Sequence, residues 1–208
     1  MHFTITSSPI PTPDTVFVFS TGPARAIAIT VAHPGLAAPL AAGVMEELIA
    51  FGCEKFIACG GAGVLDSALS RGTVVVPSSA VRDEGTSYHY IDPAREIGVN
   101  PDVVQVIEAV LQRDSARYQV GKTWTTDAFY RETRTRVARR KAEGCLTVEM
   151  ECAAFLAVSH FRGVLFGQLL ATGDVSGVEW DRRDWGSASH TDFADRLFWL
   201  SVEACECL

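Results

Sequence analysis

The sequence predicts a single α/β domain in which helices cover both faces of a central mixed, twisted sheet. Short β-rich runs alternate with helical segments along the chain, and no repeat, low-complexity tract or linker interrupts the alternation. The 208 residues are 48% hydrophobic, which is enough for one sizeable core. We therefore expect one three-layer α/β/α domain over residues 1–208, in which residues 1–14, rich in Ser, Thr and Pro, are a loose lead-in.

Local patterns predict the individual elements. Runs of β-branched and aromatic residues indicate strands, helical periodicity indicates helices, and Gly or Pro indicates their ends. The expected strands cover residues 16–19, 26–31, 56–59, 73–76, 118–124, 146–150 and 164–171. The expected helices cover residues 39–51, 101–113, 133–143, 151–161 and 192–205. The first two strands should form a hairpin, the third should run into a loop at Gly60–Gly63, and Pro77 should end the fourth.

Charge and hydropathy argue against several classes of protein. The net charge of −7 disfavours a nucleic-acid partner, because proteins that bind the phosphate backbone carry clustered Lys and Arg. The basic run Arg131–Lys141 is interpreted as a solvated helix face. No apolar run reaches the roughly 18 to 20 residues that span a bilayer, and residues 1–13 lack the features of a signal peptide. We expect a cytoplasmic protein without a membrane partner.

The cysteines do not suggest a metal or redox site, because none of the six forms a Cys-x-x-Cys pair. Four of them lie in apolar surroundings and are expected to be reduced, small hydrophobic side chains: Cys53, Cys59, Cys145 and Cys152. Cys205 and Cys207 lie at the end of the chain, where we expect fraying. We expect no metal and no organic cofactor.

Three segments carry side chains suited to chemistry. Val148-Glu-Met-Glu-Cys-Ala-Ala154 places two carboxylates around a methionine at a strand-to-helix junction, and an ionised carboxylate can accept hydrogen bonds from two neighbouring hydroxyls. Thr172-Gly-Asp174 places a carboxyl group after an apolar strand, where partial desolvation raises its pKa and suits it to act as an acid. Trp124-Thr-Thr-Asp-Ala-Phe-Tyr130 ends in two aromatic rings that suit a planar heterocycle. The alternatives are a solvated junction, a turn residue and core packing, respectively.

Together these segments resemble the nucleoside phosphorylase superfamily, which includes purine nucleoside phosphorylase, uridine phosphorylase and methylthioadenosine nucleosidase. The resemblance covers roughly Ala32 to Ser176 and implies a phosphorylase/hydrolase-like fold that cleaves the bond between a base and a ribose. It implies that Met150 and Glu151 hold the ribose and that Asp174 protonates the departing base. It also makes Phe129, Tyr130 and Glu149 candidates for contacts with the base.

Two further segments resemble the family. Residues 33–48 follow the family's Gly-x-x-x-Pro…Glu-Leu spacing, but Ala37 and Leu40 stand where Gly and Ser are usual. Residues 81–90 resemble its Arg-x-x-Gly-Thr-Ser segment, in which Arg82 and His89 are candidates for the site or an interface, although either could belong to a surface network.

The side of the site that holds the nucleophile departs from the family pattern. Family phosphorylases place an arginine just before the glycine loop and a Ser or Thr within it, whereas this chain has Ala58 and Gly61. Backbone N–H groups of such a loop can still bind an anion, but the strong bidentate contact of a guanidinium is lost. The loop also resembles the Gly-Ser-Ala-Gly loop of the nucleosidases, which use water, and the chain is expected to be short at its N-terminus compared with the family.

We predict a nucleoside phosphorylase that uses phosphate as co-substrate, with Gly60, Gly61 and Arg82 as the phosphate contacts. A nucleosidase that uses water and a non-catalytic nucleoside-binding homologue remain the alternatives. The uridine-specific pattern is missing, because no Gln follows Tyr130 before Val148, and this favours a purine. The family's assembly mode and the aromatic cluster Tyr88–Tyr90 predict a homo-oligomer, a dimer or a hexamer.

Overall fold

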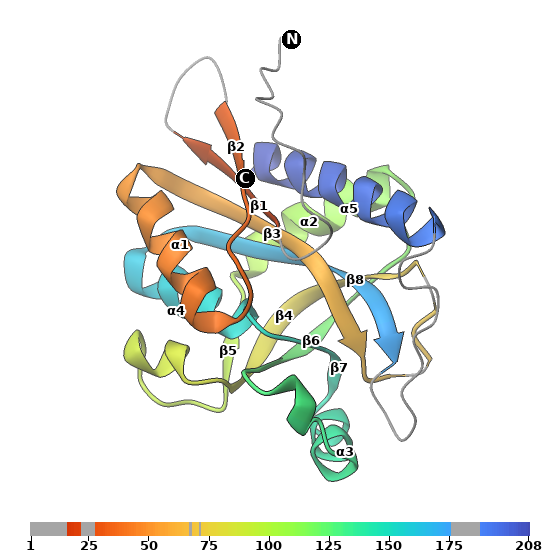
Figure 1. Cartoon of the computed structure of the whole chain (residues 1–208). Helices are drawn as coiled ribbons and strands as arrows, with labels where there is room; N and C mark the ends of the chain where they lie inside the picture. The colour runs from red at the N-terminus through yellow and green to blue at the C-terminus, as the bar shows by residue number, and fades with distance from the viewer. Residues whose placement is uncertain (1–15, 22–27, 67, 71, 176–187) are drawn as a thin grey trace.

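A computed structural model describes residues 16–21, 28–66, 68–70, 72–175 and 188–208, and confirms an α/β domain with a mixed sheet (Figure 1). The strands are β1 Val16–Thr21, β2 Ala28–Ala32, β3 Cys53–Val64, β4 Val74–Asp83, β5 Glu96–Gly98, β6 Tyr118–Thr126, β7 Cys145–Glu149 and β8 Leu165–Val175. The α-helices are α1 Ala38–Ala50, α2 Pro101–Arg113, α3 Arg134–Ala142, α4 Cys152–Arg162 and α5 Ala188–Cys207. Two 3₁₀ turns, η1 Thr86–His89 and η2 Phe129–Arg131, follow β4 and β6. The lead-in and most of the hairpin turn lie outside the described residues.

The sheet curls because its pairings close on themselves. The strand order is β2-β1-β3-β7-β6-β4-β5, and β8 pairs with both β3 and β4. β8 lies parallel to β3, and β6 lies parallel to both β4 and β7. β3 and β7 meet only near their carboxyl ends, where Gly63 pairs with Val148. The carboxyl ends of β3, β7 and β8 therefore lie next to one another.

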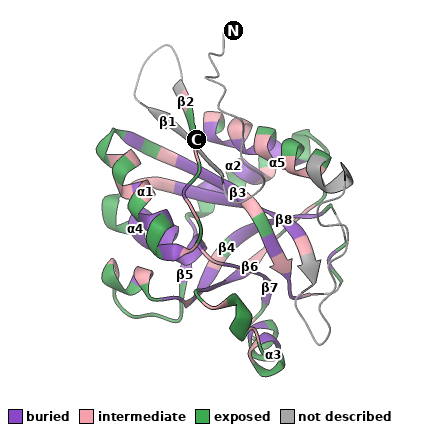
Figure 2. Cartoon of the chain, in the orientation of Figure 1, coloured by how far each residue is buried: buried purple, intermediate pink, exposed green. Residues whose placement is uncertain are grey.

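Helices cover both faces of the sheet. α1 and α4 lie on one side of β3 and β8, and α2 and α5 lie on the other (Figure 1). Two adjacent residues of β8 show both contacts. Phe166 packs against Phe155 of α4, with ring centroids 5.1 Å apart, whereas a Cβ on Gly167 would lie 2.7 Å from side-chain atoms of Val103 and Ile107 in α2. The central strands and α4 are accordingly buried along most of their described length (Figure 2).

Two predicted boundaries are wrong because strand pairing overrides local signals. Gly60–Gly63 is not a loop but the end of β3, held in register with residues 170–172 of β8. Pro77 does not end its strand, because β4 continues to Asp83 past an irregularity in pairing between Pro77 and Ser79. That irregularity falls where proline has no N–H to donate.

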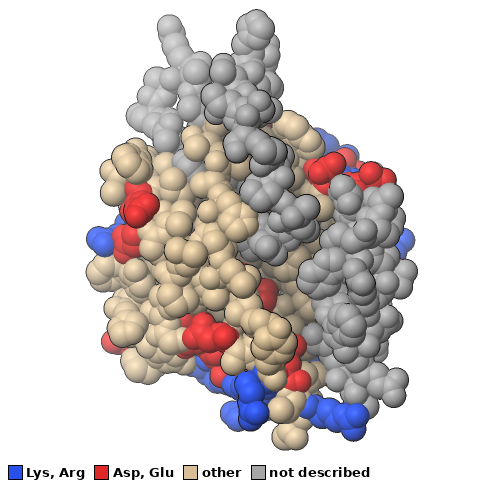
Figure 3. Space-filling view, in the orientation of Figure 1, with Lys and Arg blue, Asp and Glu red and all other residues tan. Residues whose placement is uncertain are grey.

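The basic run Arg131–Lys141 is not only a solvated helix face, as predicted, because one of its arginines is buried. Arg140 is buried and bridges Asp83 and Glu143, and Asp83 accepts further hydrogen bonds from Arg136 and the Trp124 indole. The Lys and Arg atoms gathered at the α3 end of the molecule lie beside acidic groups (Figure 3). Cys205 is buried rather than frayed, because α5 packs on β3 up to its last turns. None of the described helices is long and apolar enough to cross a membrane.

Candidate active site

The centre of the candidate site is the turn from β7 into α4. Glu149 ends β7, Glu151 is the N-cap of α4, and Met150 lies half-buried between them. Both carboxylates are buried, with 6% of Glu149 and 4% of Glu151 exposed. Because an unpaired buried carboxylate is very unfavourable, the partners of these two groups determine how the turn is built.

Glu149 acts as a side-chain cap for α4. Its Oε2 atom accepts hydrogen bonds from the backbone N–H groups of Glu151 and Cys152, at 2.8 and 2.6 Å. Its Oε1 atom accepts one from the Thr125 hydroxyl at 2.6 Å, and Thr125 Oγ1 in turn accepts the Ala153 N–H at 3.0 Å. The first N–H groups of the helix, which lack partners within it, are thereby satisfied. The Glu149 carboxylate thus fixes the position of Met150 and Glu151.

Burial, and to a smaller extent the neighbouring Glu151 charge, raise the pKa of Glu149 to about 8. The hydrogen bonds from Thr125, Cys152 and Glu151 oppose this shift, because they favour the ionised form. A carboxyl group that titrates near neutral pH therefore lies directly beneath the residue expected to bind the ribose.

Glu151 is oriented by the start of α1. Its Oε1 atom accepts the Ala37 N–H at 2.7 Å, and its Oε2 atom lies 3.3 Å from the Met150 N–H donor. Ala37 has φ 70° and ψ 161°, a conformation that residues other than glycine rarely adopt. Ala37, which stands where the family usually has glycine, therefore has a strained backbone and contacts a carboxylate of the site. The N-termini of α1 and α4 both face this pair of acids, and their dipoles stabilise negative charge there.

The glycine segment and Asp174 come close to this turn. Continuing the β3–β7 register from Gly63 and Val148 brings Gly61 level with Met150. Asp174 is the last residue but one of β8 and precedes Val175, which pairs with Val64 of β3. The Asp174 side chain lies outside the described part of the structure. The backbone therefore brings the predicted ribose, nucleophile and acid residues to one edge of the sheet.

The aromatic candidates follow β6 at the same edge, since Thr125 of β6 pairs with Glu149. Phe129 and Tyr130 lie in η2 with ring centroids 4.2 Å apart, and both are exposed. They are therefore accessible to a ligand. Their contact with a base stays a prediction.

Arg82 is placed differently from the other candidates. It is buried in β4, and its guanidinium donates to Ser87 Oγ and to the carbonyl oxygens of Asp92 and Ile91. The guanidinium carbon lies 3.9 Å from the Tyr88 ring centroid. These contacts hold the segment after β4 in place, so Arg82 has a structural task here, and its contact with phosphate stays a prediction. His89 is exposed in η1.

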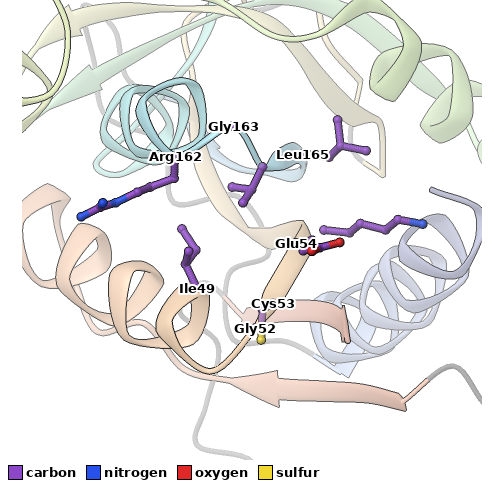
Figure 4. A pocket seen from close by; sticks show the side chains of 9 residues that line it. Ile49, Gly52, Cys53, Glu54, Arg162, Gly163 and Leu165 are labelled. Carbon is purple, nitrogen blue, oxygen red and sulfur yellow. The ribbon is translucent and has the colours of Figure 1, made fainter. Parts of the chain in front are cut away.

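Two surface hollows border α1 and α4. One is lined at the amino ends of β3 and β8 by residues including Cys53, Glu54 and Leu165, at the opposite end of these strands from Gly60–Gly63 (Figure 4). The other is lined by residues of α1, η1 and α4 together with Asp127, which accepts the Gly85 N–H at 2.9 Å. Of these two hollows, the second adjoins the site, because Pro39, two residues after Ala37, is among the residues that line it.

A sequence profile of the phosphorylase superfamily matches residues 6–197. The chain belongs to this superfamily. One relative is a guanosine phosphorylase from Halorubrum lacusprofundi. It is 28% identical to this chain over 74% of the chain and 66% of its own length. A uridine phosphorylase from Thermococcus kodakarensis is 31% identical over 53% of the chain and 40% of its own length. The chain thus spans less than two thirds of these relatives.

The fold has a solved counterpart. A purine nucleoside phosphorylase from Toxoplasma gondii, in complex with immucillin-H, superposes with a TM-score of 0.76 at 22% identity, over 86% of this chain and 73% of that one. At this identity the likeness establishes the fold, and it confirms the phosphorylase-like architecture expected from the sequence.

Sequence reasoning missed two residues that organise the turn. Thr125 lies 24 residues before Glu149, and its role depends on the β6–β7 register, which no local pattern gives. The Ala37 N–H contact depends on how α1 packs beside α4. The only signal for this contact in the sequence was that Ala37 replaces the usual glycine in a segment that otherwise follows the family's spacing.

The raised pKa of Glu149 predicts a pH-dependent stability. The folded state holds a proton on Glu149 between the ordinary carboxyl pKa, near 4.5, and about 8, whereas the unfolded chain has lost it. Stability should therefore fall as pH rises through this window, by up to about 1.4 kcal/mol per pH unit. Glu149→Gln, which cannot titrate, should flatten this slope in urea unfolding followed from pH 5 to 8.

Glu47→Gln is the matched control, because Glu47 is exposed on α1. This variant should retain the wild-type slope. An unchanged slope in Glu149→Gln, or a wild-type stability that rises with pH over this window, would contradict the assignment.

Proposed function

We propose that this chain is a nucleoside phosphorylase that cleaves the N-glycosidic bond of a purine ribonucleoside with phosphate, giving the free base and ribose 1-phosphate. The observation that supports it most is the β7–α4 turn, where Glu149 accepts the backbone N–H of Glu151 and the Ala37 N–H donates to the Glu151 carboxylate. An oriented carboxylate suits two neighbouring hydroxyls of a ribose. Fixing it before the substrate arrives lowers the cost of binding.

The proposed reaction uses residues at one edge of the sheet. Glu151 and Met150 orient the ribose, and Phe129 and Tyr130 lie against the base, with Glu149 as the remaining base-site candidate. An oxygen of hydrogen phosphate bonds to the anomeric carbon as the C–N bond breaks and its electron pair passes to the base. Asp174 gives the base a proton, which is replaced by the one that hydrogen phosphate loses. No organic cofactor takes part, and Gly60, Gly61 and Arg82 are the proposed phosphate contacts.

A nucleosidase is the second candidate, and two residues favour it. Ala58 is fully buried in β3, so the position offers no cation, and Gly61 offers a backbone N–H but no hydroxyl. Water would then replace phosphate as the nucleophile and free ribose would be the product. The base class is a separate question, because the relatives include both guanosine and uridine phosphorylases.

The decisive assay incubates guanosine, inosine or uridine with the protein, with and without phosphate. We expect purine release that requires phosphate and yields ribose 1-phosphate. Asp174→Asn should slow turnover by about 10²–10⁴-fold, the usual contribution of one general acid. Free ribose in phosphate-free buffer would favour the nucleosidase, and saturable binding without any product would favour a non-catalytic homologue. Full turnover by Asp174→Asn would contradict its role.

We also propose that the chain forms a symmetric homo-oligomer, a dimer or a hexamer. Phe161 lines the hollow beside the site and is exposed, and so are Leu40 and Tyr88, whose neighbours in sequence Pro39 and His89 line it; a partner would cover such large apolar side chains. Light scattering at micromolar concentration should give at least twice the 22.5 kDa of one chain. A mass of one chain would contradict this proposal.

A further inference from the structure

The aromatic segment that follows β6 is mostly exposed, although the proposed reaction needs its rings in a fixed place. Phe129 is 45% exposed and Tyr130 is 90% exposed. Hydrogen bonds inside the segment shape the turn itself. The Ala128 N–H donates to Thr126 Oγ1 at 3.2 Å, and the Arg131 N–H donates to the Ala128 carbonyl oxygen at 2.8 Å. Such bonds join residues close in sequence, so they do not orient the rings relative to the rest of the site.

Asp127 connects this segment to a distant part of the chain. Its Oδ2 atom accepts the backbone N–H of Gly85 at 2.9 Å, across 42 residues of sequence. The two strands that lead to these residues end together, because the last residue pair of β4 and β6 is Asp83 with Thr126. The Asp127 side chain therefore continues the connection between the strands beyond the sheet, from the turn that leads into η2 to the turn that leads into η1.

The turn that Asp127 contacts is held by buried polar groups. The carboxylate of buried Glu84 accepts the backbone N–H of Ser87 at 2.9 Å and also the Ser87 hydroxyl. Ser87 Oγ accepts a hydrogen bond from Arg82 Nε at 2.9 Å, and the same guanidinium donates to two carbonyl oxygens after η1. Because a buried polar network is costly to rearrange, Gly85 has a fixed position to which Asp127 is anchored.

The effect of the bond between Asp127 and Gly85 is expected to be local. Asp127 is exposed, so water can replace either partner and the bond adds little to the free energy of unfolding of the whole domain. The geometric consequence is larger, because Asp127 lies only two residues before Phe129. Fixing its side chain fixes the backbone from which the first aromatic ring projects.

We propose that Asp127 is a positioning residue for base recognition, which holds Phe129 in place for stacking by anchoring its turn to Gly85. This inference rests on the proposed function, because that function places the base against Phe129. It also gives the network of Arg82, Ser87 and Glu84 a task at the site, since this network fixes the anchor. Asp127 acts through Phe129 and does not touch the substrate.

Two substitutions separate this role from others, because the side-chain oxygen of Asp127→Asn can still accept the Gly85 N–H, whereas Asp127→Ala has no acceptor. A stacked ring contributes about two- to tenfold to affinity. In calorimetry, Asp127→Ala should therefore weaken the binding of hypoxanthine about fivefold and leave that of ribose 1-phosphate unchanged. Asp127→Asn should recover most of the loss. Equal losses in both variants would overturn the proposal, because the charge and not the hydrogen bond would then matter.

A double-mutant cycle tests whether Asp127 acts through Phe129. Phe129→Ala alone should weaken hypoxanthine binding about tenfold, since the stacked ring is lost. In that background, Asp127→Ala should add less than about twofold. Additive losses would mean that Asp127 affects the base by another route, and would contradict the proposal.

Asn100→Ala is the matched control. Asn100 Oδ1 accepts the Asp102 N–H at 2.9 Å at the start of α2, so this variant loses a bond of the same length on the other side of the sheet. It should lower the melting temperature and leave both dissociation constants unchanged. Asp127→Ala should show the opposite pattern. A lowered melting temperature in Asp127→Ala, without the difference between base and sugar, would indicate a purely structural role and overturn the proposal.

Hydrogen exchange makes the test independent of turnover. In Asp127→Ala the backbone amides of residues 128–132 should exchange faster, and in Asp127→Asn they should exchange as in the wild type. Unchanged exchange and unchanged hypoxanthine affinity in Asp127→Ala would overturn the positioning role even while nucleoside cleavage holds. A wild type that cleaves no nucleoside would contradict the proposed function, and exchange and hypoxanthine affinity would still decide the role of Asp127. A wild type that neither cleaves inosine nor binds hypoxanthine would overturn both.

Discussion

The site depends on how one buried carboxylate is satisfied. Glu149 accepts hydrogen bonds from two backbone N–H groups of the turn and from the Thr125 hydroxyl, and Thr125 links it to Ala153 of α4. Losing any of these donors would leave a carboxyl oxygen or a helix terminus without a hydrogen bond in the interior, which is far more unfavourable than losing an exposed ion pair. The start of α4, and with it the position of Glu151, is therefore tied to β6 as well as to β7.

The second carboxylate is fixed from another direction. Ala37, at the start of α1, donates its N–H to Glu151 from a backbone conformation that suits glycine. Two helix N-termini thus converge on two acids, and their partial positive charge favours the ionised form of each.

Local signals in the sequence were sufficient where the chain determines its own structure. α2 spans Pro101–Arg113 as predicted, because Asn100 caps it through the Asp102 N–H, Pro101 starts it and its apolar residues recur with helical spacing. The strand-to-helix turn at Met150 was likewise found from its motif. The continuation of the strands through Gly60–Gly63 and past Pro77 could not be predicted, because each depends on pairing with a strand distant in sequence.

The environments of two buried polar side chains could not be predicted from the sequence for a related reason. Gln168 lies in a run that is otherwise apolar, and only the β3–β8 register shows that it faces Ala58. Arg140 appears in the sequence as one of several surface cations, and only the packing of α3 against Asp83 shows why this one is buried. In both cases, residue type and spacing allowed the correct secondary structure, but the environment of the side chain came from tertiary pairing.

The most direct test of this account measures whether Glu151 recognises ribose hydroxyls. Calorimetry on Asp174→Asn, which should bind substrate without consuming it, would compare guanosine with 2′-deoxyguanosine, with and without the further change Glu151→Gln. Since a hydrogen bond to a charged group contributes about 1.5–3 kcal/mol, we expect guanosine to bind at least about tenfold more tightly, and Glu151→Gln to remove most of that preference. Equal affinities, or a preference that survives Glu151→Gln in a protein of unchanged melting temperature, would contradict the central claim.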